Sequence, residues 1–130
     1  ETIGARASQL AAIPEIRTAL LDMQRNFKSD ASLVTDGRDM GTVIFPNADL
    51  KIFLTAHDTV RARRRCDELH AKGLPVSYEA VLEQLRKRDL RDSQRSNAPL
   101  YAASDCILID SSQQQIPVIV AKLLNLWHNN

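Results

Sequence analysis

The chain has 130 residues, which is enough for one domain of ordinary size. Its hydrophobic content of 44% and charged content of 25% are typical of a soluble globular protein, and it contains no run of about 18 apolar residues that would span a membrane. The formal net charge of +1 argues against bulk electrostatic adhesion to nucleic acid or membrane, so a basic function would need local clusters.

The cysteines and histidines do not group into a recognisable site. Cys66 and Cys106 lie far apart in the sequence, and no CxxC or Cys/His cluster accompanies them. We therefore expect two reduced, partly buried thiols and no bound metal, a pattern typical of a cytoplasmic protein. His57, His70 and His128 have no partner at metal-ligand or triad spacing, so we interpret them as structural or surface residues.

The predicted elements are helices separated by short strands. Apolar residues recur at helical spacing from about residue 3 to residue 27, and Pro14 suits the start of a second helix within this region. A β-branched run at Ser32–Thr35 predicts a first strand. The later elements are expected as strand, helix, helix, strand and helix, at Leu50–Thr55, Thr59–Lys72, Ser77 to beyond Leu90, Cys106–Asp110 and Ile116–Trp127.

Local signals mark several of these helices. Asp58 or Thr59 is expected to cap the helix that Gly73 ends, and Ser77 is expected to begin the next one. Trp127 lies at helical spacing in the last helix, where we expect it to be part of the core.

The predicted strands are nearly continuous apolar runs separated by helices, which indicates an α/β fold with a parallel sheet. In such folds, ligands bind at the edge where the carboxyl ends of the strands meet. Asp36, Arg38 and Asp39 follow the first strand. A carboxylate there can hold a hydroxyl or cationic group, and the guanidinium can hold a phosphate. The alternative is a solvated turn whose charges pair locally.

Two further basic clusters leave alternatives open. One predicted helical face is shared by Arg88, Arg91, Asp92 and Arg95. This face forms either exposed ion pairs or an arginine surface that closes over phosphates, as phosphoryl transfer requires. The arginine run at 61–65 suits anion binding, a solvated basic face or an RNA contact. The RNA interpretation is weak because aromatic residues are only 5% of the chain.

Several of these segments together resemble the cytidylate kinase family of P-loop nucleoside monophosphate kinases. The resemblance covers almost the whole chain and is most specific in DGRDMGTVIFP at 36–46 and RDxRDxxR at 88–95. It implies a three-layer α/β/α fold with a parallel sheet. It also implies transfer of the ATP γ-phosphate to CMP or dCMP, with Mg²⁺ accompanying ATP.

The resemblance implies roles for individual residues. It implies that Arg88 and Arg95 take part in catalysis by binding phosphate. It also implies a catalytic role for Asp36, which would lie beside the catalytic centre. Arg61 and Arg64 are implied in a lid that closes over ATP and excludes water. The acceptor nucleotide is expected to contact a larger set, namely Ser8 and Arg17 on the base side, Asp39 and Asp92 near the sugar, and Arg38, Arg88 and Arg95.

The chain departs from the family pattern in one respect, because it contains no phosphate-cradling run GxxxxGK followed by Ser or Thr. We therefore expect a partial kinase domain, with acceptor-site elements at 1–56, a lid region at 57–97, and a last strand and helix at 98–130. Such a partial domain lacks the N-terminal half of the kinase and the central strand of the sheet. We therefore do not expect this chain to form a stable, active monomer alone. The complete enzyme is expected to be monomeric. The alternatives are a non-catalytic nucleotide-binding module and, less favoured, an arginine-rich RNA-binding domain.

Overall fold

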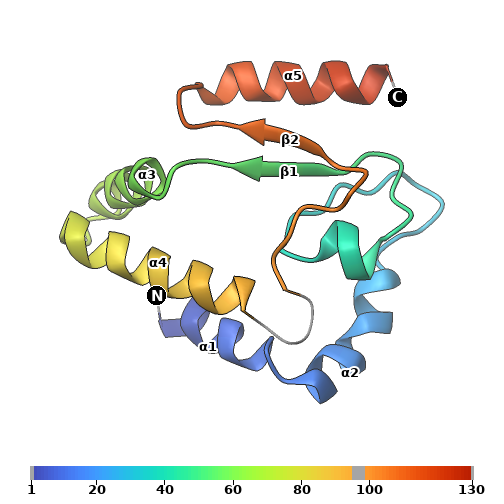
Figure 1. The fold of residues 1–130 in the computed structure, drawn as a ribbon, viewed down its shortest axis with the longest axis horizontal. Coiled ribbons are helices and arrows are strands. Elements are labelled where there is room, and N and C mark those ends of the chain that lie inside the picture. The colour runs from blue at the N-terminus through green and yellow to red at the C-terminus, as the bar shows by residue number, and fades with distance from the viewer. Residues whose placement is uncertain (1, 95–98, 130) are drawn as a thin grey trace.

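The computed structural model describes residues 2–94 and 99–129 as a set of helices around a two-stranded parallel sheet (Figure 1). This arrangement confirms the predicted α/β class with parallel strands. The elements, in chain order, are α1 (Thr2–Leu10), α2 (Pro14–Arg25), the π-helical turn η1 (Met40–Ile44), β1 (Ile52–Thr55), α3 (Asp58–Ala71), α4 (Tyr78–Ser93), β2 (Ile107–Asp110) and α5 (Ile116–His128).

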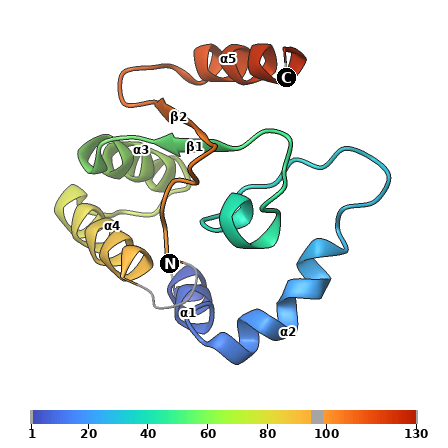
Figure 2. The ribbon, with the colours of Figure 1, turned by 45° about the vertical axis from the view of Figure 1, so that its right-hand side comes forward.

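The sheet brings two predicted strands together in parallel register. Ile52 of β1 pairs with Ile107 of β2, and the register runs on to the pair Thr55 and Asp110. The carboxyl ends of both strands therefore lie side by side, as the sequence predicted. In both ribbon views α5 lies beyond β2, on the opposite side of the strands from α1 and α2 (Figures 1 and 2).

The strand predicted at Ser32–Thr35 is wrong, since the backbone there is irregular. Val34 is 93% exposed and Leu33 is 37% exposed, so neither packs as a strand residue of a buried sheet would. A β-branched run forms a strand only when a neighbouring strand satisfies its backbone N–H and C=O groups. Within the described residues the sheet contains only β1 and β2, so this segment has no such neighbour.

Local sequence signals explain most helix ends. Pro14 occupies the first turn of α2, and the Ser77 hydroxyl accepts a hydrogen bond from the Ala80 N–H at 3.1 Å at the start of α4. Gly73, with φ of +73°, follows α3 and ends it as predicted. The prediction that Asp58 or Thr59 caps α3 is wrong, because His57 holds that position and no side chain caps the helix.

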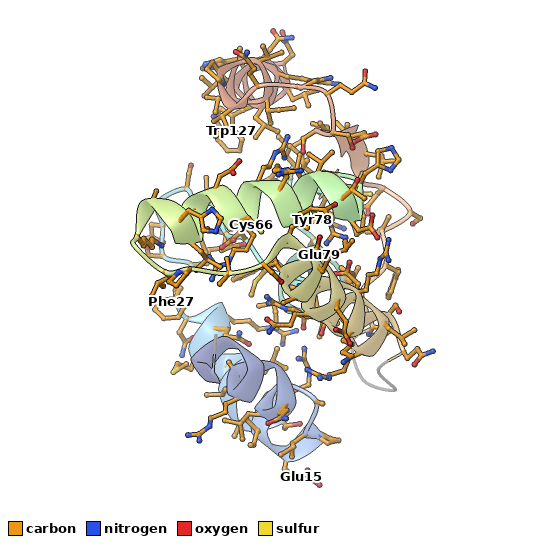
Figure 3. The ribbon with its side chains drawn as sticks, turned by 90° about the vertical axis from the view of Figure 1, so that its left-hand side faces the viewer. Glu15, Phe27, Cys66, Tyr78, Glu79 and Trp127 are labelled. Carbon is orange, nitrogen blue, oxygen red and sulfur yellow. The ribbon has the colours of Figure 1, made fainter. Side chains whose placement is uncertain are left out.

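The buried apolar cluster of the structure lies between α3 and α4. It contains Ala62, Cys66, Leu69 and Val81, with Tyr78 among the partly buried side chains packed against it. Figure 3 shows Cys66 on α3 and Tyr78 at the start of α4. These two helices therefore form an antiparallel pair with a core of its own.

Helix α5 carries apolar side chains that remain exposed. Trp127 is 48% exposed and Ile116 is 80% exposed, so the prediction that Trp127 belongs to the core is wrong for this structure. Within α5, the buried side chain is Ile119. A helix that is apolar on most of its surface is normally covered by other protein. None of the helices in the described part of the chain has both the length and the apolar character needed to cross a bilayer.

Candidate functional site

The charged run after the first predicted strand folds into a turn around Asp39. The main-chain oxygen of Asp39 accepts from the N–H groups of Thr42, Val43 and Ile44 at 3.3, 2.9 and 3.2 Å, and Asp39 is the N-cap residue of η1. Asp39 itself is buried, with 9% of its surface exposed. A buried carboxylate requires a charged or hydrogen-bonding partner.

Arg17 of α2 is that partner. It donates from Nη2 to the Asp39 carboxylate and from Nη1 to the Ala11 oxygen at 3.2 Å. The two side chains of the ion pair are 17% and 12% exposed, so the pair is largely shielded from water. The pair connects the first turn of α2 to the start of η1.

Arg38 connects the same turn to α4. Its Nε donates to the carboxylate of Asp92, whose side chain is fully buried, and Arg88 lies 3.7 Å from the same carboxylate oxygen. The structure thus brings the cluster at 36–39 together with Arg88 and Asp92 of α4. It also excludes the exposed ion pair as an interpretation of Arg88 and Asp92, because Asp92 is 0% exposed.

The arginine run of α3 makes intramolecular contacts. Arg61 donates to both oxygens of Asp89 at 3.1 and 2.5 Å, and the hydrogen bond to this carboxylate raises the pKa of the Arg61 guanidinium. Arg64 donates to the main-chain oxygen of Ser111 at 2.6 Å. Arg63 stacks over Tyr78, with 4.9 Å from its guanidinium carbon to the ring centroid.

Arg65 completes the run by pairing with Glu68 at 2.7 Å. Arg61 and Arg65 are thus ion-paired, whereas Arg63 and Arg64 are exposed and contact neutral groups. The RNA-contact interpretation therefore stays an alternative that depends on two exposed arginines.

Of the three remaining predicted site residues, the structure describes the side chain of Asp36 alone. Asp36 is exposed on the irregular segment before η1. Ser8 lies in α1, but its side chain is outside the described part of the structure. Arg95 also lies outside the described residues.

The sequence reasoning missed a second ion pair beside the site. Lys51 Nζ donates to Asp105 at 2.6 Å and to the Pro46 oxygen at 2.5 Å, and the Lys51 side chain is only 9% exposed. The hydrogen bond from Lys51 lowers the pKa of the Asp105 carboxyl. The parallel register would have revealed this pair, because Lys51 directly precedes β1 and Asp105 lies two residues before β2.

A cavity of about 110 Å³ opens beside these residues. Its lining includes Arg38, Gly41, Lys51, Phe53, Tyr101 and Cys106. The guanidinium of Arg38 thus belongs to both the ion pair with Asp92 and the wall of this cavity.

Among the described residues, no group of three or more His, Cys, Asp and Glu side chains is placed to hold a metal ion. Mg²⁺ in phosphoryl-transfer sites does not require such a group, since it keeps several waters and is held by one or two carboxylates plus substrate phosphates. A single exposed carboxylate such as Asp36 fits that mode of binding.

Comparison with known proteins gives a consistent result. The family model described as Cytidylate kinase matches residues 1–129. The curated protein named Cytidylate kinase from Pseudomonas paraeruginosa is 54% identical over 125 residues, which is 96% of this chain and 55% of the relative. The protein of that name from Dichelobacter nodosus is 52% identical over 127 residues, 98% of this chain and 57% of the relative. The chain thus spans about half the length of the curated relatives it matches.

Proposed function

This chain belongs to the cytidylate kinase family, and we propose that it forms the acceptor-nucleotide site and the lid of an enzyme that transfers the ATP γ-phosphate to CMP or dCMP. The products are CDP or dCDP. The observation that carries the proposal is the meeting of two charged clusters at one place. The shared carboxylate of Asp92 brings Arg38 and Arg88 together, 50 positions apart in sequence, beside the buried pair of Arg17 and Asp39.

The chemistry of this place suits a nucleoside monophosphate. Arg88 is 47% exposed, so its guanidinium remains accessible to a phosphate while it stays within reach of Asp92. The carboxylate of Asp39, whose side chain is 12% exposed, can accept hydrogen bonds from a sugar hydroxyl or an exocyclic amine, whereas the fully buried Asp92 orients Arg38 and Arg88. Fixed cations next to the reacting phosphate stabilise the charge that spreads over its oxygens in the transition state.

Mg²⁺ would neutralise part of the charge on the ATP phosphates when the nucleotide is bound. In this proposal Asp36 contacts the ion through water, since it is exposed next to Arg38. Arg61 and Arg64 lie in the first half of α3, which follows the carboxyl end of β1, and Arg64 also reaches the main-chain oxygen of Ser111 just after β2. We assign both arginines to the lid.

We further propose that activity requires a P-loop-bearing part of the protein in addition to these residues. Three observations support this. The sequence has no GxxxxGK run followed by Ser or Thr, and the chain spans about half the length of its curated relatives. The structure also leaves apolar side chains uncovered on both strands, with Leu54 at 55% and Leu108 at 63% exposure. A P-loop-bearing strand next to β1 would cover such surface and would also pair the segment at 32–36.

A chimera tests the proposal. It joins this chain to the part of the Pseudomonas paraeruginosa relative that the chain does not match, in the order that the relative has. We expect the chimera to phosphorylate CMP and dCMP in preference to UMP and AMP, and the chain alone to bind CMP without transferring phosphate. A soluble, folded chimera with no preference for cytidine nucleotides would contradict the proposal.

The same titrations separate the alternative functions. CMP binding by the chain without activity of the chimera would favour a non-catalytic nucleotide-binding module. Nucleic-acid binding that falls steeply with salt, without any preference among mononucleotides, would favour an RNA-binding domain.

A further inference from the structure

Arg25 makes contacts that no sequence motif indicated. It is the last residue of α2, and its guanidinium reaches the far end of η1. Nε donates to the Ile44 oxygen at 3.1 Å, and Nη2 donates to the Val43 oxygen at 3.2 Å. The last carbonyl groups of any helix lack intrahelical partners, so the fork of one guanidinium satisfies two of them at once.

Helix α2 therefore holds η1 at both ends. Arg17, in its first turn, binds the carboxylate of Asp39 at the start of η1, and Arg25 binds the carbonyls at its end. The two arginines are eight residues apart, or about 12 Å along the helix axis. Figures 1 and 2 show η1 next to the C-terminal half of α2, in agreement with these hydrogen bonds.

The turn itself needs such support. A π-helical turn is rare and is found mostly inside α-helices, whereas η1 stands alone between irregular segments. In η1 it is closed by the Phe45 N–H, which donates to the Met40 oxygen at 2.7 Å, and by three N–H groups on the Asp39 oxygen. Because Ile44 N–H is one of those three, loosening the end of the turn also loosens the main chain at Asp39.

We propose that Arg25 is a positioning residue of the acceptor site, which holds η1 in place and thereby fixes Asp39 and Arg38 for the nucleotide. The proposal rests on the proposed function for the identity of the ligand. The hold on η1 itself rests on the hydrogen bonds from Arg25 and Arg17. Lysine cannot fully replace Arg25, because an ammonium group is a point charge and does not present two donors in a fixed fork.

Hydrogen exchange in the chain at low temperature tests the hold on η1. The variants are Arg25→Ala and Arg25→Lys, and the matched control is Arg86→Ala, which removes an exposed ion pair with Asp58 in the α3–α4 pair. Loss of two hydrogen bonds from a charged donor predicts about 10- to 100-fold faster exchange at Val43 to Phe45 in Arg25→Ala. We expect an intermediate effect in Arg25→Lys and none at η1 in Arg86→Ala. Amides of α3 and α4 serve as the internal reference and should not change in the Arg25 variants.

A CMP titration of the same proteins tests the positioning role. We expect the dissociation constant to rise about tenfold or more in Arg25→Ala, less in Arg25→Lys, and not in Arg86→Ala. Unchanged exchange at η1 in both Arg25 variants would overturn the inference. Faster exchange with unchanged CMP affinity would overturn it as well, because Arg25 would then serve the scaffold alone.

The two proposals fail in different ways. If the unmodified chain shows no CMP binding, the proposed function is refuted for the chain, and the exchange rates alone decide whether Arg25 holds η1. If Arg25→Ala does not fold, so that the α3–α4 reference amides also lose protection, the comparison of Arg25→Lys with Arg86→Ala decides both questions.

Discussion

The ion pair between Arg38 and Asp92 is expected to stabilise the fold measurably. Asp92 is fully buried, and Arg38 is 32% exposed. Removing one member of a buried ion pair costs about 3–5 kcal/mol when the other remains dry. Arg38 can regain water, and Asp92 keeps Arg88 at 3.7 Å, so we expect each single substitution to alanine to cost about 2–3 kcal/mol.

A double-mutant cycle isolates the interaction. We expect a coupling free energy of about 1.5–2 kcal/mol between Arg38→Ala and Asp92→Ala, because one charge-assisted hydrogen bond is lost in common. The assay is urea unfolding of the chimera. We use the chimera because its added part is expected to cover the apolar surface that the chain alone exposes. Equal slopes with urea concentration would show that the substitutions change stability and not compactness.

The control is the same cycle for Arg65 and Glu68, which form an exposed pair on α3. We expect the coupling for this exposed pair to be clearly smaller than that for Arg38 and Asp92, because water screens its charges. If the cycle for Arg38 and Asp92 gives no more coupling than this control, the claim that a buried charge pair joins η1 to α4 is wrong.

Three further predictions follow from the site and the surface. Arg88→Ala and Arg95→Ala in the chimera should each lower kcat/KM on the order of 100-fold, which corresponds to about 3 kcal/mol of transition-state stabilisation. Unchanged kinetics in either variant would show that this arginine does not bind the reacting phosphate. Lys72 and Arg65 lower the pKa of Glu68 from 4.5 to about 2. The stability lost in Glu68→Gln should thus be full above pH 4.5 and vanish as pH falls to about 2, and a difference independent of pH in urea midpoints would contradict this. The chain alone should bind a hydrophobic dye and melt broadly below about 45 °C, and a sharp transition at high temperature would disprove this.

The helices were predictable because their signals are local. Pro14, Gly73 and Ser77 act on backbone groups within a few residues, so their effects are visible in the sequence. The irregular backbone at Ser32–Thr35 was not predictable in this way. The composition of this segment is that of a strand, but strand formation depends on a neighbour that pairs with it, and the described sheet provides none.

The candidate site was predictable in composition and not in geometry. The motifs selected Arg38, Asp39 and Asp92, and the structure places these residues within one connected set of contacts. Arg17 and Arg25, which hydrogen-bond to the two ends of η1, belong to a different helix. No periodicity in the sequence indicates such contacts, because they depend on how α2 packs against η1.

In the proposed function, the same charged residues serve both the assembly of the fold and nucleotide binding. The buried apolar cluster belongs to α3 and α4. Apart from the buried Ile44, η1 is joined to its neighbours by the ion pairs of Arg17 with Asp39 and of Arg38 with Asp92, and by the hydrogen bonds of Arg25. A nucleotide that engages Arg38 or Asp39 must therefore exchange with, or share, a carboxylate or guanidinium that already holds two elements together. Binding free energy and the docking of α4 against η1 are consequently linked. In the proposed function, this linkage lets the acceptor nucleotide draw the lid toward η1, since α4 carries both Asp92 and the Asp89 partner of Arg61.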